Sequence, residues 1–555
     1  MTATTDSTFS AAAHEPQMKR ALGVGHLTAI GIGAIVGAGL FSLTGQAAAF
    51  HAGPAVILSY LLAAIPAGLT GLCYAELAAM FPASGSCYTY TRKAAGDFAA
   101  WVIGWTLILE FGVAAATVAT SFSGYTNSLL GNWGIQLPPM LLNGPLATGD
   151  GVVPGLINLP AVAIITACSL LLLRGITESA WVNTLIVIVK LVIIVGLVGL
   201  GLAWVKPENY VPFIPPNAGT FGVFGWSGVL QATGIIFFSY IGFETVSCAA
   251  QETRNPQRDM PLGMLASLLI CAVLYVAFSA ILVGLVPYTQ LTGDAPASTA
   301  LAATPYHWAL TLVDVGILAG NTTSVLTALY GQSRIFVVMA ADGMLPRSLA
   351  SIHPRWRTPW ISIILFWIFT GALAGFLPLE MLGDTTSIGT LFAFAAVAAC
   401  VLILRRTRPD APRPFRVPLV PLVPGAAIVS CLGLIAFLEP WAWARLLGWL
   451  ALGLVVWFTR PLWQRRMRRS VTTMTRSPLL ARMIQYESRT QYALIVCAGM
   501  TAWISSPASR NGAALARILS RSAISRSAEP LDRLDPAPVR LSTFGGRSHG
   551  CSPVQ

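Results

Sequence analysis

The sequence predicts an all-α membrane protein with about twelve transmembrane helices. Of its 555 residues, 55% are hydrophobic and only 10% are charged, whereas a soluble domain carries about 25% charged residues. The basic residues behind the net charge of +12 stand in short clusters between long apolar stretches rather than in one patch. This pattern is typical of membrane topology and argues against a nucleic-acid partner. Most of the surface is therefore expected to face the lipid bilayer.

The apolar stretches are long enough to cross a bilayer, which requires about 20 apolar residues per helix. Some are longer than that, and a tilted helix or an interfacial turn accommodates the excess. The predicted spans are 27–50, 54–80, 98–126, 158–174, 180–204, 223–250, 262–287, 308–340, 360–378, 385–404, 422–438 and 441–459.

Lysine and arginine residues favour one side of the predicted membrane. In alternate connections between spans they recur, whereas the opposite set of connections carries only Lys206. Because positively charged connections stay in the cytoplasm, we predict a multi-pass protein of the inner (plasma) membrane with both termini cytoplasmic. The cytoplasmic set comprises Lys19, Arg20, Arg92, Lys93, Arg174, Arg254, Arg258, Arg347, Arg355, Arg357, Arg405, Arg406, Arg408, Arg413, Arg416, Arg460, Arg465, Arg466, Arg468 and Arg469.

Three parts are expected along the chain. Residues 1–24 form a cytoplasmic N-terminal segment, which lacks the apolar core and cleavage site of a signal peptide. Residues 25–462 form the transmembrane domain. Residues 463–555 are rich in serine, arginine, alanine and proline, a composition that predicts a disordered cytoplasmic tail.

Glycines interrupt two of the predicted helices. The first contains GIGAIVGAGLF at 31–41, and the sixth contains FFSYIGFET at 237–245. A lone glycine would indicate close helix packing, but glycine-interrupted segments at corresponding positions of two halves are typical of transporters built from inverted repeats. The N–H end of a broken helix attracts a carboxylate and the carbonyl end attracts an ammonium. Such a pair suits a zwitterion, for example an amino acid.

Ionisable residues also occur inside the apolar stretches. Lys190 stands near the centre of the span 180–204, too deep for its stem to reach either interface easily. A charge at that depth is costly and is by default functional, so Lys190 is a candidate proton carrier; the alternative is a lysine that only holds helix carbonyls. Glu110 and Glu244 are further acids within predicted spans, and Glu76 is expected to be a solvated or interfacial contact.

Signatures of enzymes and of cofactor sites are absent from the sequence. The six histidines do not cluster, and the nine cysteines show no CxxC spacing, so neither metal nor redox chemistry is indicated. No GxxxxGK[ST] motif is present, which argues against ATP-driven transport. We therefore predict that the protein is not an enzyme and has no cofactor and no metal.

Several stretches resemble the amino acid–polyamine–organocation superfamily, and within it the cationic-amino-acid-transporter branch. The resemblance covers about residues 20–460. It implies two inverted five-helix repeats plus two further helices, broken first and sixth helices, and alternating access around a site at the membrane midplane. The stretches are GIGAIVGAGLF at 31–41, YAELAAMFPASGSCYTYTRKAAGDFAAWVIGW at 74–105, FFSYIGFETVSCAAQETRNPQRDMP at 237–261, GQSRIFVVMAADGMLP at 331–346, SIGTLFAF at 387–394 and RPFRVP at 413–418.

The resemblance also implies a substrate site. Members of the superfamily hold the substrate carboxylate and amine at the unwound backbone of the first and sixth helices. Glu110 resembles the acid of the third helix and is expected to face the side-chain pocket, whereas Lys190 resembles the lysine that replaces a sodium ion in proton-coupled members. The matching backbone positions are Ile35, Val36, Gly37, Ala38, Gly39, Phe238, Ser239, Tyr240 and Ile241, and Asn321, Thr322, Thr323 and Ser324 lie near the hydroxyl ligands of sodium-driven members.

The predicted function is secondary active transport of amino acids by proton-coupled symport, so the expected partners are an amino acid, protons and lipid. The branch usually reads GFD where this chain has Glu244, and it often has two acids where this chain has Gln251-Glu252. These departures leave the choice between a cationic and a neutral substrate open. Two alternatives also stay open: an amino acid or amine exchanger without proton coupling, and a membrane protein that senses amino acids without transporting them. The oligomeric state is not predicted.

Overall fold

The computed structural model describes residues 22–81, 86–147, 153–175 and 180–475. Within these ranges the regular structure is helical, apart from an isolated bridge between Leu22 and Thr253. The chain separates into two units, residues 1–464 and 465–555, and the helix breaks and cavities lie in the first. Most of the predicted N-terminal segment and tail lies outside the described residues.

The described residues form a series of helices along the chain. In chain order they are α1 (Val24–Ile35), η1 (Gly39–Leu43), α2 (Thr44–Ala47), η2 (Ala48–Ala52), η3 (Gly53–Ala55), α3 (Val56–Met80), α4 (Ser86–Asn132), α5 (Pro139–Leu142), α6 (Leu159–Leu173), α7 (Ala180–Leu202), η4 (Pro207–Tyr210), α8 (Gly225–Ile236), η5 (Phe237–Tyr240), η6 (Phe243–Glu252), α9 (Pro256–Leu285), η7 (Tyr288–Gln290), α10 (Pro296–Ala302), α11 (His307–Ala341), η8 (Arg347–Ala350), α12 (Trp360–Phe376), α13 (Leu379–Thr407), α14 (Leu422–Phe437) and α15 (Pro440–Thr475).

Eight helical segments of the described residues are long and apolar enough to cross a membrane, and α1, α6, α12 and α14 are shorter apolar helices. The all-helical, multi-pass class is thereby confirmed, whereas the count of twelve spans, the inverted repeats and the membrane orientation stay predictions. The eight segments are Gly39–Met80, Cys87–Asn132, Thr184–Leu202, Gly225–Ser247, Pro256–Leu285, His307–Ala341, Leu379–Thr407 and Pro440–Arg460.

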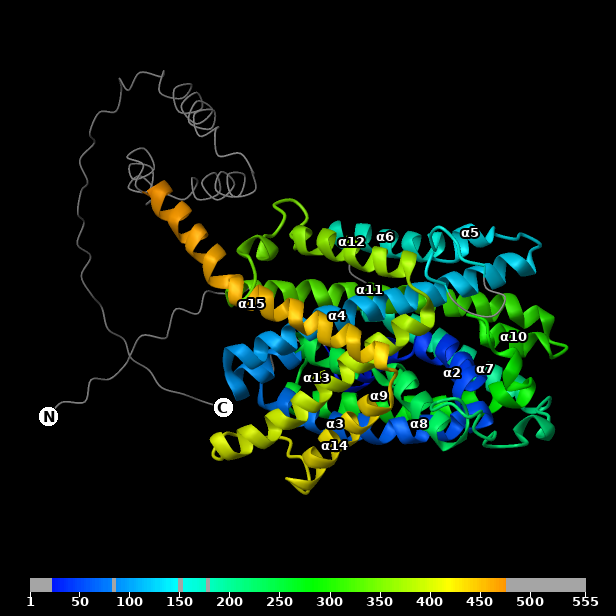
Figure 1. Ribbon diagram of the computed structural model, residues 1–555. Coiled ribbons are helices and arrows are strands. Elements are labelled where there is room, and N and C mark those ends of the chain that lie inside the picture. Colours follow the sequence, from blue (N-terminus) through cyan, green and yellow to red (C-terminus); the bar gives the residue numbers. More distant parts are fainter. Residues whose placement is uncertain (1–21, 82–85, 148–152, 176–179, 476–555) are drawn as a thin grey trace, which may run out of the picture. The chain divides into compact units, whose positions relative to one another are not determined.

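Long helices pack against one another around the first span. The helices α4 and α11 lie side by side (Figure 1), α13 also packs on α4, and α9 packs on both α1 and α3. Trp105 of α4 and Trp449 of α15 stack with ring centroids 5.0 Å apart, and each indole N–H donates to the other's carbonyl oxygen at 2.8 Å. These reciprocal bonds satisfy both indole donors and fix α15 on α4.

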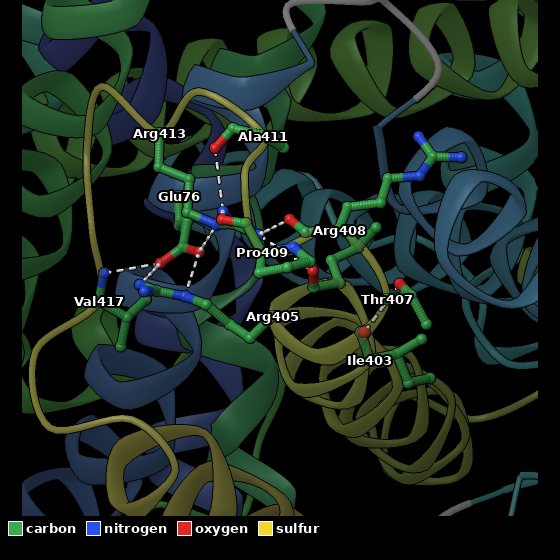
Figure 2. Close-up of polar contacts among 10 residues, drawn as sticks. Glu76, Ile403, Arg405, Thr407, Arg408, Pro409, Ala411, Arg413 and Val417 are labelled. Carbon is green, nitrogen blue, oxygen red and sulfur yellow. Dashed lines mark hydrogen bonds and ion pairs between the residues drawn. The ribbon is translucent and has the colours of Figure 1, made fainter.

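A buried carboxylate ties α3 to α13 and to the connection that follows it (Figure 2). Arg405 donates two hydrogen bonds to Glu76, at 3.0 and 2.7 Å, and the Val417 N–H donates a third at 2.7 Å. The buried Arg413 guanidinium forms an ion pair with the same carboxylate at 3.3 Å. The expectation of a solvated Glu76 is therefore wrong: its side chain is 1% exposed, because the connection folds back over the end of α3.

Candidate functional site

The first predicted span is broken within its glycine-rich stretch. The helix α1 ends at Ile35, and Val36 has an extended backbone with φ −76° and ψ 108°. Helical structure resumes at η1, whose first residue is Gly39. The N–H groups of Leu40 and Phe41 both donate to the Gly37 carbonyl oxygen at 3.2 Å. The break thus places a carbonyl end of one half-helix and an N–H end of the next at the same depth.

The sixth predicted span is broken as well, beside the first break. Helix η5 ends at Tyr240, Ile241 is extended, and Gly242 has a φ of 120° that favours glycine. A Cβ atom on Gly242 would lie 2.7 Å from the carbonyl carbon of Ala34. Only a residue without a side chain allows this approach, so Gly242 brings the two breaks into backbone contact.

Two buried tyrosines complete the hydrogen bonding of the breaks. The Tyr275 hydroxyl of α9 lies 3.0 Å from the carbonyl oxygen of Ile35 and 2.9 Å from that of Ser239. The Tyr60 hydroxyl of α3 donates to the Gly39 carbonyl oxygen at 3.2 Å. Sequence reasoning missed both residues. The available signal was tyrosine within an apolar stretch, where a buried hydroxyl needs a polar partner.

Lys190 occupies the carbonyl end of α1. Its Nζ atom donates to the carbonyl oxygens of Gly33 and Val36, both at 2.8 Å, and to the Ser324 hydroxyl at 3.1 Å. The side chain is 1% exposed. An ammonium has three donors, and each has an acceptor here. The end of α1 carries partial negative charge, so a cation from α7 holds the broken helix against α11.

A cavity of about 60 Å³ lies at the two breaks. It is also lined by Phe111, Ala114 and Val118 of α4 and by Ala328 of α11. The volume accommodates about four water molecules, so an amino acid requires the lining elements to move apart. The predicted site residues that line it are Ile35, Gly37, Ala38, Gly39, Phe238 and Ile241.

The other predicted site residues of the two breaks lie behind this lining. The Val36 carbonyl oxygen accepts a hydrogen bond from Lys190. Ser239 lies close to Gly39: a Cβ atom added to Gly39 would be 2.6 Å from the Cα atom of Ser239. The Tyr240 hydroxyl donates to a carbonyl of α3 at 3.0 Å.

Glu110 and Glu244 are both buried, and they differ in their relation to the cavity. Glu110 is 2% exposed and is not among the lining residues, although its neighbour Phe111 is. Glu244 lines the cavity instead, where its carboxylate accepts the Gly242 N–H at 2.9 Å.

Comparison with known proteins gives the family. The amino acid permease family model matches residues 22–445. The chain belongs to this family. The resemblance to the amino acid–polyamine–organocation superfamily is therefore confirmed, and the permease is a membrane transporter and not an enzyme.

Curated relatives match most of the permease. A branched-chain amino acid permease of Bacillus subtilis (strain 168) is 41% identical over 454 residues, which are 81% of this chain and 95% of the relative. A methylthioribose transporter of the same organism is 38% identical, with the same coverage of both chains. The vacuolar cationic amino acid transporter 4 of Arabidopsis thaliana is 37% identical over 71% of this chain and 64% of the relative. The permease thus resembles transporters of differing substrates.

Proposed function

We propose that this permease carries neutral aliphatic amino acids across the cytoplasmic membrane by proton-coupled symport. The observation that carries the proposal is the convergence of both helix breaks on one small cavity with an apolar lining. The N–H end that begins at Gly39 suits the substrate carboxylate, and the carbonyl end of η5 suits its ammonium, whereas Lys190 already occupies the carbonyl end of α1. Alternating access follows if the breaks act as hinges between two arrangements.

The lining favours an uncharged aliphatic side chain. Phe111, Val118, Ile241 and Ala328 present apolar surface to the cavity, and burial of apolar surface contributes about 25 cal/mol per Å². A relative that is matched over 95% of its own length is named a branched-chain amino acid permease. Both observations support leucine, isoleucine or valine as the substrate.

A cationic amino acid is the second candidate, because Glu244 lines the cavity and several relatives are named cationic amino acid transporters. A buried carboxylate stabilises a substrate ammonium or guanidinium. Against this candidate, the Glu244 carboxylate already accepts the Gly242 N–H, and most of the residues around it are apolar.

Lys190 is the proposed coupling residue. When it is protonated, its three hydrogen bonds hold the end of α1 to α7 and α11. Loss of the proton removes the positive charge from the carbonyl end and weakens that hold. The protonation state would then bias the two arrangements, which is the condition for a proton to drive transport.

A competition panel tests the substrate assignment. Liposomes that contain the full chain take up labelled leucine under an inward proton gradient, in the presence of each of the twenty amino acids in turn. We expect leucine, isoleucine and valine to reduce uptake and lysine and arginine to leave it unchanged. The opposite ranking would favour the cationic candidate, and uptake that no amino acid reduces would contradict both.

A further inference from the structure

A second and larger cavity, of about 380 Å³, lies among the carboxyl end of α4, the connection 291–295 and α10. It shares no lining residue with the cavity at the helix breaks. Half of its lining residues have hydroxyl or amide side chains, and Asp294 adds one carboxylate. Of the described residues that line it, none carries a positive charge. The cavity is therefore a candidate binding site separate from the helix breaks.

Three polar side chains of this lining donate hydrogen bonds to a buried acid. Ser128 and Asn132 of α4 each donate to the Asp314 carboxylate at 3.0 Å, and the Ser298 hydroxyl of α10 donates to its other oxygen. Asp314 is fully buried. The two serine hydroxyls are thereby used as donors and keep lone pairs as acceptors, whereas the Asn132 amide offers both its oxygen and its second N–H to the cavity.

Asn143 and Asp294 add further oxygen acceptors to the lining. The Asn143 amide N–H₂ donates to the Val153 carbonyl oxygen at 2.8 Å, which leaves the amide oxygen as an acceptor. The Asp294 carboxylate accepts the Gln46 amide at 3.3 Å, and its backbone carbonyl accepts the Ser42 hydroxyl at 2.7 Å. An ionised carboxylate can accept further hydrogen bonds. The cavity thus presents one negative charge and several oxygen acceptors, together with further N–H groups of its three asparagines.

We propose that this cavity binds the primary ammonium group of an amino acid or organic amine, with Asp294 as its counter-charge. An ammonium has three donors and no acceptor, which complements the Asp294 carboxylate and the hydroxyl and amide oxygens of this lining. A bare divalent cation would need several oxygen ligands at about 2.0–2.6 Å, and the described residues contain no group of three acidic, histidine or cysteine side chains that could hold a metal. The inference goes beyond the proposed function and does not depend on it.

The binding should depend on pH through Asp294, which lies in a connection outside the spanning helices. Burial raises the pKa of Asp294 to about 6. The titratable groups around it are Asp314 of α11 and Tyr125 of α4, and neither supplies a positive charge. The carboxylate is therefore anionic above about pH 6 and becomes neutral below it, so the affinity for an ammonium falls as the pH is lowered.

Equilibrium dialysis of the full chain in lipid nanodiscs tests the proposal, with labelled isopentylamine as the probe. At pH 7.5 we expect Asp294→Asn to raise the Kd about tenfold, because it removes the counter-charge and keeps the shape. Asn127→Leu, at an exposed position of the lining, should weaken binding without altering the fold. Glu208→Gln is the matched control, since Glu208 is exposed in η4 and its loss changes the net charge equally.

Further arms separate this site from the helix breaks. A shift from pH 7.5 to 5.0 should weaken binding in the parent and leave Asp294→Asn unchanged, and 4-methylpentanoate, which lacks the ammonium, should not compete. Unchanged affinity in Asp294→Asn, or no amine binding by the parent, overturns the proposal. So does loss of binding in Gly37→Val alone, which would place the amine at the breaks. If leucine uptake fails while amine binding depends on Asp294, the proposed function falls and this inference stands.

Discussion

Single glycines set how closely the broken helices approach each other and the cavity. Gly242 and Gly39 meet backbone atoms within 3 Å of an added Cβ, whereas an added Cβ on Gly37 would have the Ser324 hydroxyl as its nearest contact, at 3.3 Å. The spacing of the glycines predicted the breaks. It could not predict which glycine touches which segment, because the partners are about 200 residues apart in the chain.

At Gly37, the size of a substituent should decide activity. We expect Gly37→Val to reduce leucine uptake to background, because its methyl groups enter the cavity. Gly39→Val should do the same by displacing Ser239. Gly37→Ala should retain uptake, since the neighbouring hydroxyl can yield by a few tenths of an ångström. Uptake is compared at equal amounts of membrane-inserted protein, and normal transport by Gly37→Val would refute the site assignment.

Substitution of Lys190 should separate binding from coupling. Lys190→Ala removes the charge that holds α1, so we expect proton-driven accumulation of leucine to be lost. Exchange of external labelled leucine into liposomes preloaded with unlabelled leucine should persist. Lys190→Arg should also fail to accumulate substrate, because arginine does not release its proton. If Lys190→Ala concentrates leucine as the parent does, the lysine only caps the helix carbonyls and the proton path lies elsewhere, with Glu110 and Glu244 as the next candidates.

Predictability from sequence differs among the site residues. Lys190 could be predicted because a charge inside an apolar stretch is costly and therefore rare unless it has a function. Tyr60 and Tyr275 could not be assigned to the helix breaks, because their hydroxyls bind carbonyl groups far away in the chain, although a tyrosine within an apolar stretch indicates that a polar partner exists. The location of Glu244 in the lining, with Glu110 outside it, depends on how the helices are rotated and on where the chain turns at the break before η6, and hydrophobic periodicity does not fix either.

At the scale of helices, Glu76 joins α3 to α13 and to the connection before α14 (Figure 2). We call its contacts with Arg405, Arg413 and Val417 the Glu76 clamp. The sequence has an acid at a predicted helix end, but hydropathy does not indicate the connection that covers it. Glu76 is nearly fully buried together with Arg413, and removal of one partner of a buried ion pair costs about 3–5 kcal/mol. The clamp should therefore matter for stability.

Thermal stability of two variants tests the clamp. We expect Glu76→Gln to lower markedly the temperature at which half of the purified protein loses its monodisperse peak in size-exclusion chromatography. Asp97→Asn is the matched control, because the Arg92–Asp97 pair is exposed and such pairs contribute about 0–1 kcal/mol. Equal shifts in the two variants would show that the clamp contributes no more than a surface pair.

Helix boundaries were predicted well where the sequence is apolar and poorly elsewhere. The predicted span 98–126 corresponds to part of α4, which begins at Ser86 and continues across a non-helical Gly96 to Asn132. Hydropathy identifies only the apolar length of a helix, so it does not detect polar extensions at either end.

At the scale of the whole molecule, composition was sufficient for the class, but not for the span count. A low charged fraction excludes a soluble protein of this length, and the structure has eight helical segments of spanning length among the described residues. The four shorter apolar helices have 12 to 17 residues. The helix α1 is short because its span is broken, which length alone does not reveal.

Removal of the tail should leave transport intact. Deletion from residue 476 onward removes only residues outside the described ranges and retains the helix breaks, both cavities and the Glu76 clamp. We expect leucine uptake per inserted molecule to equal that of the full chain, because the composition of the tail does not bury a core. Complete loss of uptake in a deletion variant that inserts normally would show that the tail takes part in transport.

Accumulation of leucine in liposomes that contain the parent protein is the most direct test of proton-coupled transport. The liposomes carry an inward proton gradient and no sodium, and the assay is repeated after an ionophore has collapsed the gradient. We predict that internal leucine rises above the external concentration and that the ionophore abolishes this rise. Uptake that never exceeds that of protein-free liposomes, or accumulation that persists without the gradient, would contradict proton-coupled symport.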